Sequence, residues 1–473
     1  MHLSRNATSG PSRRRRAVST LLGVGIGALL VTGGFDFDPS DASSAAASPP
    51  DALPTDGKPN PTAPKSDRVD LETPSFSNPT KVDNPLFPIG DLHSAILLGN
   101  DEGRALRIET TLLPGTKTIE WKGKKVKTLV SQFVSYLDGR IHEVALDWYA
   151  QADDGAVWYF GENVFNFQDG KVADTQGSWV AGKDGPPGMI MPAEPQVGAV
   201  YRTENIPGKV FEEVTVEAGG LTVDGPRGPV PGAILGRENH LIEGNYEDKT
   251  FAPGYGEFRS GVGGNLEALA VAVPTDALPT GVPAEIATIS RGANDIFDAA
   301  AAGNWDAAAS TLDSMKTAWA THRASGTVPP LLDTQMSLAL DALTGNPLVP
   351  AVQARNDEGA RTAAVDVGLA SRDLELQYRP VSEIDLARFD LWSRRLLGDS
   401  GSAEADPGHI AGDVAALTRV WDRIAHTVDP SAARAIKAEL GRLQKAAKQE
   451  DVASAAERAK RLSQEVAGLQ PAA

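Results

Sequence analysis

The sequence predicts a multidomain protein in which an antiparallel β-rich domain is followed by an all-α helical bundle. Short strand-like runs separated by turn residues fill positions 84–273, and apolar residues at helical spacing fill positions 284–473. A stretch with Pro and Thr at 274–283 lies between the two and is predicted to be a linker. A chain of 473 residues has room for two or three domains.

The composition excludes several classes of function. The formal net charge is −17, which argues against a nucleic-acid partner because phosphate binding needs clustered Lys and Arg side chains. The chain contains no cysteine. Disulfides, thiolate nucleophiles, iron–sulfur clusters and zinc–thiolate sites are therefore excluded, and so is a lipoprotein anchor.

The N-terminus has the pattern of an export signal. Four arginines at positions 13–16 precede an apolar run at 17–31. We predict that residues 1–34 are a signal peptide or an N-terminal membrane anchor, because the run approaches the length of a membrane-spanning helix. Positive charge stays in the cytoplasm, so the rest of the chain is expected to be secreted or to lie on the extracellular face of the cytoplasmic membrane. General secretion and twin-arginine export are both compatible with this pattern.

Residues 35–83 are predicted to be a disordered stalk. They are rich in Pro, Ser, Ala and Asp and carry few large apolar side chains. Such a segment cannot bury enough apolar surface to offset the entropy lost when it is ordered. A stalk of this composition would hold the folded domains away from the membrane.

The β-rich domain is predicted from short runs of strand-forming residues between turn signals. Its lengths and spacings favour an antiparallel meander, with a sandwich or a half-barrel as the other arrangements. Asp154-Gly155 is the best hairpin signal, because Gly supplies the positive φ of a tight turn. The strand-like runs lie at 95–98, 106–113, 117–121, 125–133, 146–151, 157–162, 210–216, 233–239 and 243–251.

A large share of the aromatic residues falls in positions 146–204, which is the basis for a predicted ligand-binding face. Aromatic rings on a sheet can stack on a ligand, but they can equally form the hydrophobic face of that sheet. Rings that line a groove would mark a ligand site, and buried rings would be core. The residues predicted to bind a ligand are Trp148, Tyr149, Trp158, Tyr159, Glu162 and Trp179.

Three motifs of this domain resemble a family of uncharacterised secreted bacterial proteins. They are Gly-x-Val-Trp-Tyr-Phe-Gly-Glu at 155–162, Gly-Ser-Trp at 177–179 and Phe-Ala-Pro-Gly-Tyr-Gly at 251–256. The family typically has Tyr where this chain has Phe251. The resemblance covers residues 84–272. It implies a β-rich fold and an exported location, and it supplies no catalytic residues.

No familiar catalytic apparatus is present, so we predict no catalytic residue, no metal site and no cofactor. The sequence lacks G-x-S-x-G, H-E-x-x-H and P-loop motifs. His93, His142 and His240 are dispersed without metal-ligand spacing. A carbohydrate-active hydrolase remains an alternative, because such enzymes need two facing carboxylates. The carboxylates available near aromatic residues are Glu143, Asp147, Glu162 and Asp184.

The helical domain is predicted to contain seven or eight helices. Spacings of three and four indicate packed seams, Asp429-Pro430 marks a helix start, and Ser382 with Asp385 resembles a capping box. The segments 300–308 and 448–456 are typical of turns between paired helices. A metal-binding helical bundle is a further alternative. Its acidic and histidine candidates are Asp366, Asp373, Asp385, Asp413, Asp422, His409 and His426.

Together these features predict an exported cell-envelope protein that acts as a non-enzymatic binding or scaffolding module. Its ligand would belong to the cell surface or cell wall, and its N-terminal segment would contact the membrane. We expect the β-rich and helical parts to be two independently cored bodies. Neither the ligand nor the oligomeric state follows from the sequence.

Overall fold

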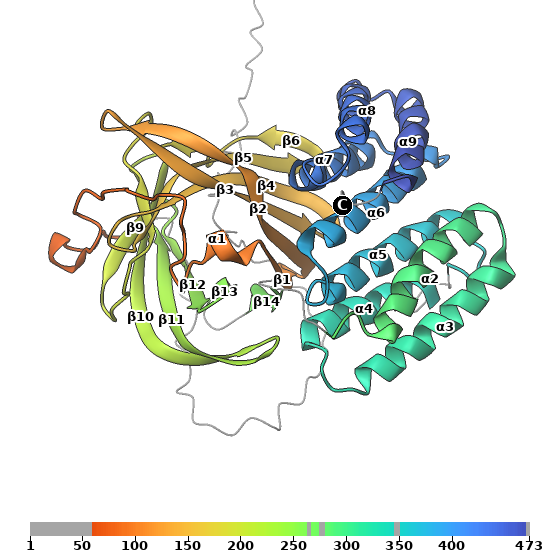
Figure 1. Cartoon of the computed structure of the whole chain (residues 1–473), viewed down its shortest axis with the longest axis horizontal. Helices are drawn as coiled ribbons and strands as arrows, with labels where there is room; N and C mark the ends of the chain where they lie inside the picture. The colour runs from red at the N-terminus through yellow and green to blue at the C-terminus, as the bar shows by residue number, and fades with distance from the viewer. Residues whose placement is uncertain (1–58, 263–265, 274–279, 345–350, 470–473) are drawn as a thin grey trace, which may run out of the picture.

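The computed structural model describes residues 59–262, 266–273, 280–344 and 351–469. It confirms the predicted fold class, because a large antiparallel sheet is followed by a helical region (Figure 1). The predicted signal or anchor at 1–34 and the first part of the predicted stalk lie outside these residues. Within the described ranges, no helix has the length and apolar character required to cross a membrane.

The sheet contains fourteen strands among the described residues, and each pairing is antiparallel. In chain order the strands are β1 (Ser94–Asp101), β2 (Arg104–Trp121), β3 (Lys124–Leu137), β4 (Arg140–Gln151), β5 (Val157–Gln168), β6 (Lys171–Asp174), β7 (Trp179–Val180), β8 (Gly188–Met191), β9 (Val200–Ile206), β10 (Val210–Gly225), β11 (Gly228–His240), β12 (Asn245–Ala252), β13 (Gly256–Gly261) and β14 (Ala268–Ala272).

The sheet curls around an interior. Its strand order is β6-β5-β4-β3-β2-β1-β14-β13-β12-β11-β10-β9. The first and last strands in the chain, β1 and β14, are therefore paired in the middle of this order. β7 and β8 both pair with β5, and β8 lies against β9 at the far end of this order. A Cβ added to Gly188 of β8 would lie 1.9 Å from the carbonyl oxygen of Thr203 in β9, so only glycine permits this approach. The side chains of one sheet face are thereby enclosed.

A single helical turn, α1 (Ile89–Leu92), lies inside the curl of the sheet (Figure 1). The sequence predicted no helix in this region. A close backbone contact between Gly90 and Val82 holds the turn in place, because Gly90 N donates a 3.0 Å hydrogen bond to Val82 O. A side chain at Gly90 would meet that oxygen at 2.6 Å. Ile89 and Leu92 are buried, so the turn contributes apolar side chains to the interior.

Residues 59–83 form a segment that we call the strap, and it differs from the predicted disordered stalk. The strap contains a short 3-10 turn, η1 (Lys65–Asp67), and Val69 N donates a hydrogen bond to Val200 O of β9. Asp153 accepts hydrogen bonds from Ser75 Oγ at 2.8 Å and from Ser77 N at 2.6 Å. Hydrogen bonds to β9 and to the β4–β5 turn therefore hold the strap against the sheet, and composition alone does not predict such contacts.

Eight α-helices follow among the described residues, as the sequence predicted, and they lie together on one side of the sheet (Figure 1). Asp429 caps α8 as predicted, but α6 begins at Val381 without a side-chain cap, so the predicted Ser382–Asp385 capping box is wrong. The helices are α2 (Ala284–Ala301), α3 (Trp305–Arg323), α4 (Pro330–Thr344), α5 (Asp357–Glu375), α6 (Val381–Gly401), α7 (Pro407–Ile424), α8 (Pro430–Lys448) and α9 (Val452–Ala467).

The helices share their cores with the sheet, contrary to the expectation of two independently cored bodies. Ile96 and Leu98 of β1 pack in one hydrophobic cluster with α2 to α6. Val134 and Tyr136 of β3 pack in a second cluster with α6 to α9, where Tyr136 stacks on Trp392 at 5.5 Å between ring centroids. Strands buried on both faces are continuously apolar, which explains the unbroken run at 95–98.

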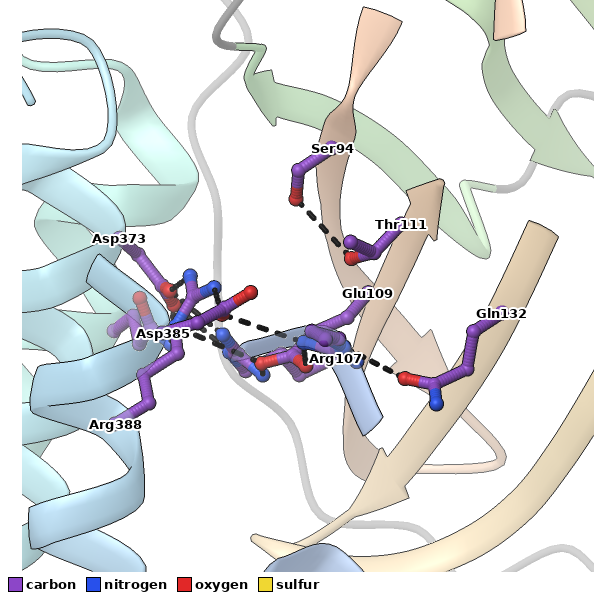
Figure 2. A network of polar contacts seen from close by, with 10 residues as sticks. Ser94, Arg107, Glu109, Thr111, Gln132, Asp373, Asp385 and Arg388 are labelled. Atoms are coloured by element: carbon purple, nitrogen blue, oxygen red, sulfur yellow. Dashed lines mark hydrogen bonds and ion pairs between the residues drawn. The ribbon is translucent and has the colours of Figure 1, made fainter. Parts of the chain in front are cut away.

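A buried ionic network joins the sheet to the helices (Figure 2). Arg107 Nη2 of β2 donates to Asp373 Oδ1 of α5 at 2.7 Å, and Arg388 Nη2 of α6 donates to the same oxygen at 2.8 Å. Arg423 Nη1 of α7 donates to Glu109 Oε2 of β2 at 2.5 Å. The network therefore connects the sheet to the helical region, because its members come from β2, α5, α6 and α7.

The charges of this network balance. Arg107, Arg388 and Arg423 meet Glu109, Asp373 and Asp385, and the last of these accepts from Arg388 Nη1 at 3.0 Å. Burial alone would raise the pKa of Glu109, but Arg423, Arg107 and Arg388 hold it far below its usual range. Since every carboxylate has a cationic partner, we assign this network a structural role and not a ligand site.

Candidate functional site

The enclosed face of the sheet carries a cluster of carboxyl groups. Asp147 of β4 and Glu162 of β5 are direct register partners, so their side chains lie side by side. Glu204 of β9 interacts with Glu162 and accepts a 2.8 Å hydrogen bond from Trp179 Nε1. Tyr159 Oη donates to Asp147 Oδ1 at 3.0 Å. We call Glu143, Asp147, Glu162 and Glu204 the interior carboxyl cluster.

The interior carboxyl cluster favours protonated side chains. Burial raises the pKa of Glu143 to about 8, with a further contribution from Asp147. Burial likewise raises the pKa of Asp147 to about 7 and that of Glu204 to about 8. Burial and then the neighbouring Glu204 carboxylate raise the pKa of Glu162 well above its usual range. Neither Glu162 oxygen has a hydrogen-bond partner of standard geometry among the described groups, and the same holds for Glu204 Oε2. A proton shared between the two carboxyl groups would give one oxygen of each a partner.

A second interior group surrounds Lys249 of β12. Its ammonium group forms an ion pair with Glu238 and lies 3.5 Å from Glu247 Oε2. Thr203 Oγ1 donates to Glu238 Oε1 at 2.9 Å. Burial would raise the pKa of Glu238, but Lys249 and His240 lower it, so this carboxylate stays ionised. We call this group the lysine cluster, and it lies on the β9 to β12 side of the interior.

A small cavity opens beside the interior carboxyl cluster, beneath α1. Its volume is about 70 Å³. The wall is largely apolar, with Leu92 of α1 and Phe133 of β3 among the lining residues. Asp147, Tyr149 and Glu257 bring polar groups to it. Burial raises the pKa of Glu257 to about 7. Apolar walls with a few convergent polar groups and shifted pKa values are typical of ligand sites.

The structure separates the residues that the sequence predicted to bind a ligand. Trp148, Trp158 and Trp179 are 2%, 5% and 1% exposed, and with Tyr159 they pack inside the sheet's hydrophobic core. Tyr149 lines the cavity, and Glu162 belongs to the interior carboxyl cluster. Tyr159 and Trp179 would therefore position Asp147 and Glu204 at this site, whereas Trp148 and Trp158 are core residues.

The carboxylates of the hydrolase alternative also separate. Glu143, Asp147 and Glu162 converge on the interior. Asp184 instead lies in the loop after β7, where Oδ2 accepts from Val180 N at 2.9 Å and Oδ1 pairs with Lys209 at 3.1 Å. Asp184 therefore stabilises its own loop and does not join the carboxyl groups of the interior.

The helical carboxylates are engaged by arginines. Asp373 and Asp385 belong to the ionic network, Asp366 pairs with Arg395, and Asp413 pairs with Arg140 at 3.1 Å. His409 is exposed at the start of α7. Across the residues that the structure describes, the group with metal-ligand geometry lies in the β domain: Glu212, Glu238 and His240.

Sequence reasoning missed Glu204, Glu238, Glu247, Lys249 and Glu257 as interior residues. Along β12, Glu247 and Lys249 alternate with Tyr246 and Asp248, and this charged row resembles the polar face of a solvated sheet. Placing Glu247 and Lys249 in the interior requires the sheet to curl, and the strand pattern carries no signal for that curl. Only the closure against β8 establishes that.

Comparison with known proteins gives no assignment for this chain. No protein-family model matches the sequence, and no curated protein sequence matches it either.

Proposed function

We propose that this protein is an exported, non-enzymatic binding module of the cell envelope, and that its β domain takes a small organic amine. The observation that carries the proposal is the cavity beneath α1, where Asp147 and Glu257 meet a largely apolar wall. Burial disfavours the ionised form of both acids. A bound ammonium group would restore that form by ion pairing, while its alkyl portion contacts Leu92 and Phe133.

The cavity volume limits the ligand. At about 70 Å³ it is roughly half the size of a cavity of about 150 Å³ that admits benzene. A primary amine with a short alkyl chain is therefore the class that the cavity fits. The natural ligand would be a cell-surface or cell-wall component that presents such a group.

Export is supported by the arginines at 13–16 and the apolar run at 17–31. Alkaline phosphatase fused behind the complete chain should be active only if residues 84–473 leave the cytoplasm. We expect activity with the complete chain and none after deletion of residues 1–34. Recovery of the complete chain in the cytosol would contradict export without affecting the ligand proposal.

Titration calorimetry with propylamine tests the binding proposal. Affinity should rise as the pH increases from 6 to 8, because Asp147 ionises through its raised pKa of about 7. Asp147→Asn and Glu257→Gln keep the side-chain shapes and should each weaken binding at least tenfold. Glu120→Gln changes an exposed residue of β2 and is the matched control. Equal heats for propylamine and propan-1-ol, or no heat with either, would contradict the amine proposal.

The hydrolase and helical metal-site alternatives receive less support. Asp147 and Glu162 project from the same face of adjacent strands, whereas glycoside hydrolysis needs carboxyl groups on both sides of the scissile bond. Glu162 is also fully buried. In the helical region, Asp366, Asp373, Asp385 and Asp413 are ion-paired with arginines, which leaves no obvious set of free ligands among them.

A further inference from the structure

We infer that the β domain binds a divalent transition-metal ion through Glu212, Glu238 and His240. Glu238 of this site belongs to the lysine cluster, and none of the three residues lines the cavity proposed for the amine. The inference therefore stands or falls independently of the proposed function.

The register of two strands brings the three side chains together. Glu212 of β10 and His240 of β11 are direct partners, and Glu238 lies two residues before His240 on the same face of β11. One oxygen of each carboxylate and one ring nitrogen all lie within 4.8 Å of one another. Ligands bound to one ion at about 2.1 Å can be up to about 4.2 Å apart, so small side-chain rotations would complete the site.

His240 provides a second, independent observation. Its side chain is 2% exposed, and its Nε2 atom has no hydrogen-bond partner among the described groups. A buried ring nitrogen without a partner is costly, and coordination to an ion would satisfy it. Asn245 interacts with the same ring and would orient it, as residues behind metal ligands commonly do.

An ion at this site would share its carboxylate ligands with the ammonium group of Lys249, which already pairs with Glu238. Lys249 is the ammonium group that faces Glu238 and Glu247, and Glu204 is the register partner of Glu212 on the other side. Acidic groups thus surround the site on β9, β10, β11 and β12. One imidazole nitrogen with two carboxylates suits Zn²⁺ or Mn²⁺ better than Mg²⁺ or Ca²⁺, which prefer oxygen ligands alone.

The site lies near the ends of two strands, β10 and β11. His240 is the last residue of β11, and Glu212 is the third residue of β10. Both therefore lie next to the β9–β10 turn at 207–209, which is exposed, and the β11–β12 turn at 241–244. An ion would need to pass only these turns, and not the length of the interior, to reach its ligands.

Calorimetric titration of the EDTA-treated full chain with Zn²⁺ tests the inference, with Mn²⁺ followed by electron paramagnetic resonance as a second probe. We expect one equivalent to bind and to raise the melting temperature. His240→Gln and Glu212→Gln should each weaken Zn²⁺ binding at least tenfold. His409→Gln makes the same change at an exposed helix start and should bind like the unmodified chain.

Two variants keep the test decisive if one of them fails to fold, which circular dichroism would show. The melting-temperature increase with Zn²⁺ should be lost in whichever variant folds, and it should not occur with Mg²⁺ in the unmodified chain. Absence of a one-to-one Zn²⁺ complex in the unmodified chain would overturn the inference. Unchanged Zn²⁺ affinity in a folded His240→Gln variant would overturn it as well.

Discussion

Arg107 in the sheet donates two parallel hydrogen bonds to Asp373 in the helical region. Nε donates to Oδ2 at 2.8 Å and Nη2 donates to Oδ1 at 2.7 Å, across 266 residues of sequence. This bidentate geometry is the strongest form of an arginine–carboxylate contact. The pair sits among Glu109, Arg388 and Arg423, so the contact fixes how α5 to α7 lie on β2 (Figure 2).

Breaking this pair from one side should be severe. Asp373→Asn leaves Arg107 and Arg388 buried with one carboxylate fewer, and we expect a loss of about 3–5 kcal/mol in the free energy of unfolding. Urea denaturation measures this loss. Lys171→Met is the control, because its pair with Glu450 also joins sheet to helices but both side chains are about half exposed. That variant should lose less than about 1 kcal/mol, and similar losses in both would argue against a dominant buried network.

The shared cores predict that sheet and helices unfold together. Calorimetry of the full chain should give one cooperative transition, since Ile96 and Val134 are buried against helices. Ile96→Ala, on the helix-facing side of β1, should lower the midpoint of the sheet and helix signals together by removing about 2–5 kcal/mol. A separate 284–473 fragment should expose the helical face and bind a hydrophobic dye. Independent, cooperative unfolding of that fragment at the full-chain midpoint would contradict the prediction.

Stability should fall as the pH rises from about 5 to 8. Glu143 has a folded-state pKa of about 8, above its ordinary value of 4.5, so the folded chain holds a proton that the unfolded chain releases in this interval. The proton-linked stability is complete below pH 4.5 and is lost as the pH approaches 8. Glu143→Gln should remove on the order of 3–5 kcal/mol of this pH dependence, since each pKa unit corresponds to about 1.4 kcal/mol.

Urea denaturation at pH 5, 6, 7 and 8 measures this slope. Glu120→Gln, at an exposed position of β2, should keep the slope of the unmodified chain. Parallel slopes for Glu143→Gln and the unmodified chain would show that Glu143 does not carry this proton.

Removing the exposed side chain of Asp153 should release the strap from the sheet. Asp153→Ala removes the acceptor of the hydrogen bonds from Ser75 Oγ, Ser77 N and Ser77 Oγ. We expect limited proteolysis to cleave residues 59–83 several times faster in this variant. Asp154→Ala is the matched neighbour, because Asp154 accepts only within its own hairpin, from Ala156 N at 2.9 Å. Equal cleavage rates for the two variants would mean that Asp153 does not hold the strap.

Local signals were sufficient for the element types and for several boundaries. The Asp154-Gly155 turn joins β4 to β5, with Gly155 at a φ of 96°, because a tight turn requires a residue that tolerates positive φ. Asp429-Pro430 starts α8 for an equally local reason, since Asp429 accepts from Ser431 N and Ala432 N. The Ser382–Asp385 prediction failed because α6 begins at Val381, which places Ser382 inside the helix, and because Asp385 is paired with Arg388 of α6 and Arg423 of α7.

The candidate site could be predicted only in part. The sequence drew attention to Asp147 and Glu162 through the aromatic residues around them, and both lie in the interior. It gave no reason to place Glu204 beside Glu162, or Glu212 beside His240, because each pair joins different hairpins or strands whose register is not local information. The aromatic rings themselves suggested a surface but were needed to fill the core.

By itself, the sequence determined that strands precede helices, because side-chain periodicity and turn residues act over a few positions. The tertiary structure alone decided that the sheet curls, that acidic residues on β4, β5, β9 and β12 end inside it, and that helices cover the part of its outer face formed by β1, β3, β4 and β14. The reason is that an alternating strand has two faces, and only contacts made across hundreds of residues determine which face meets water.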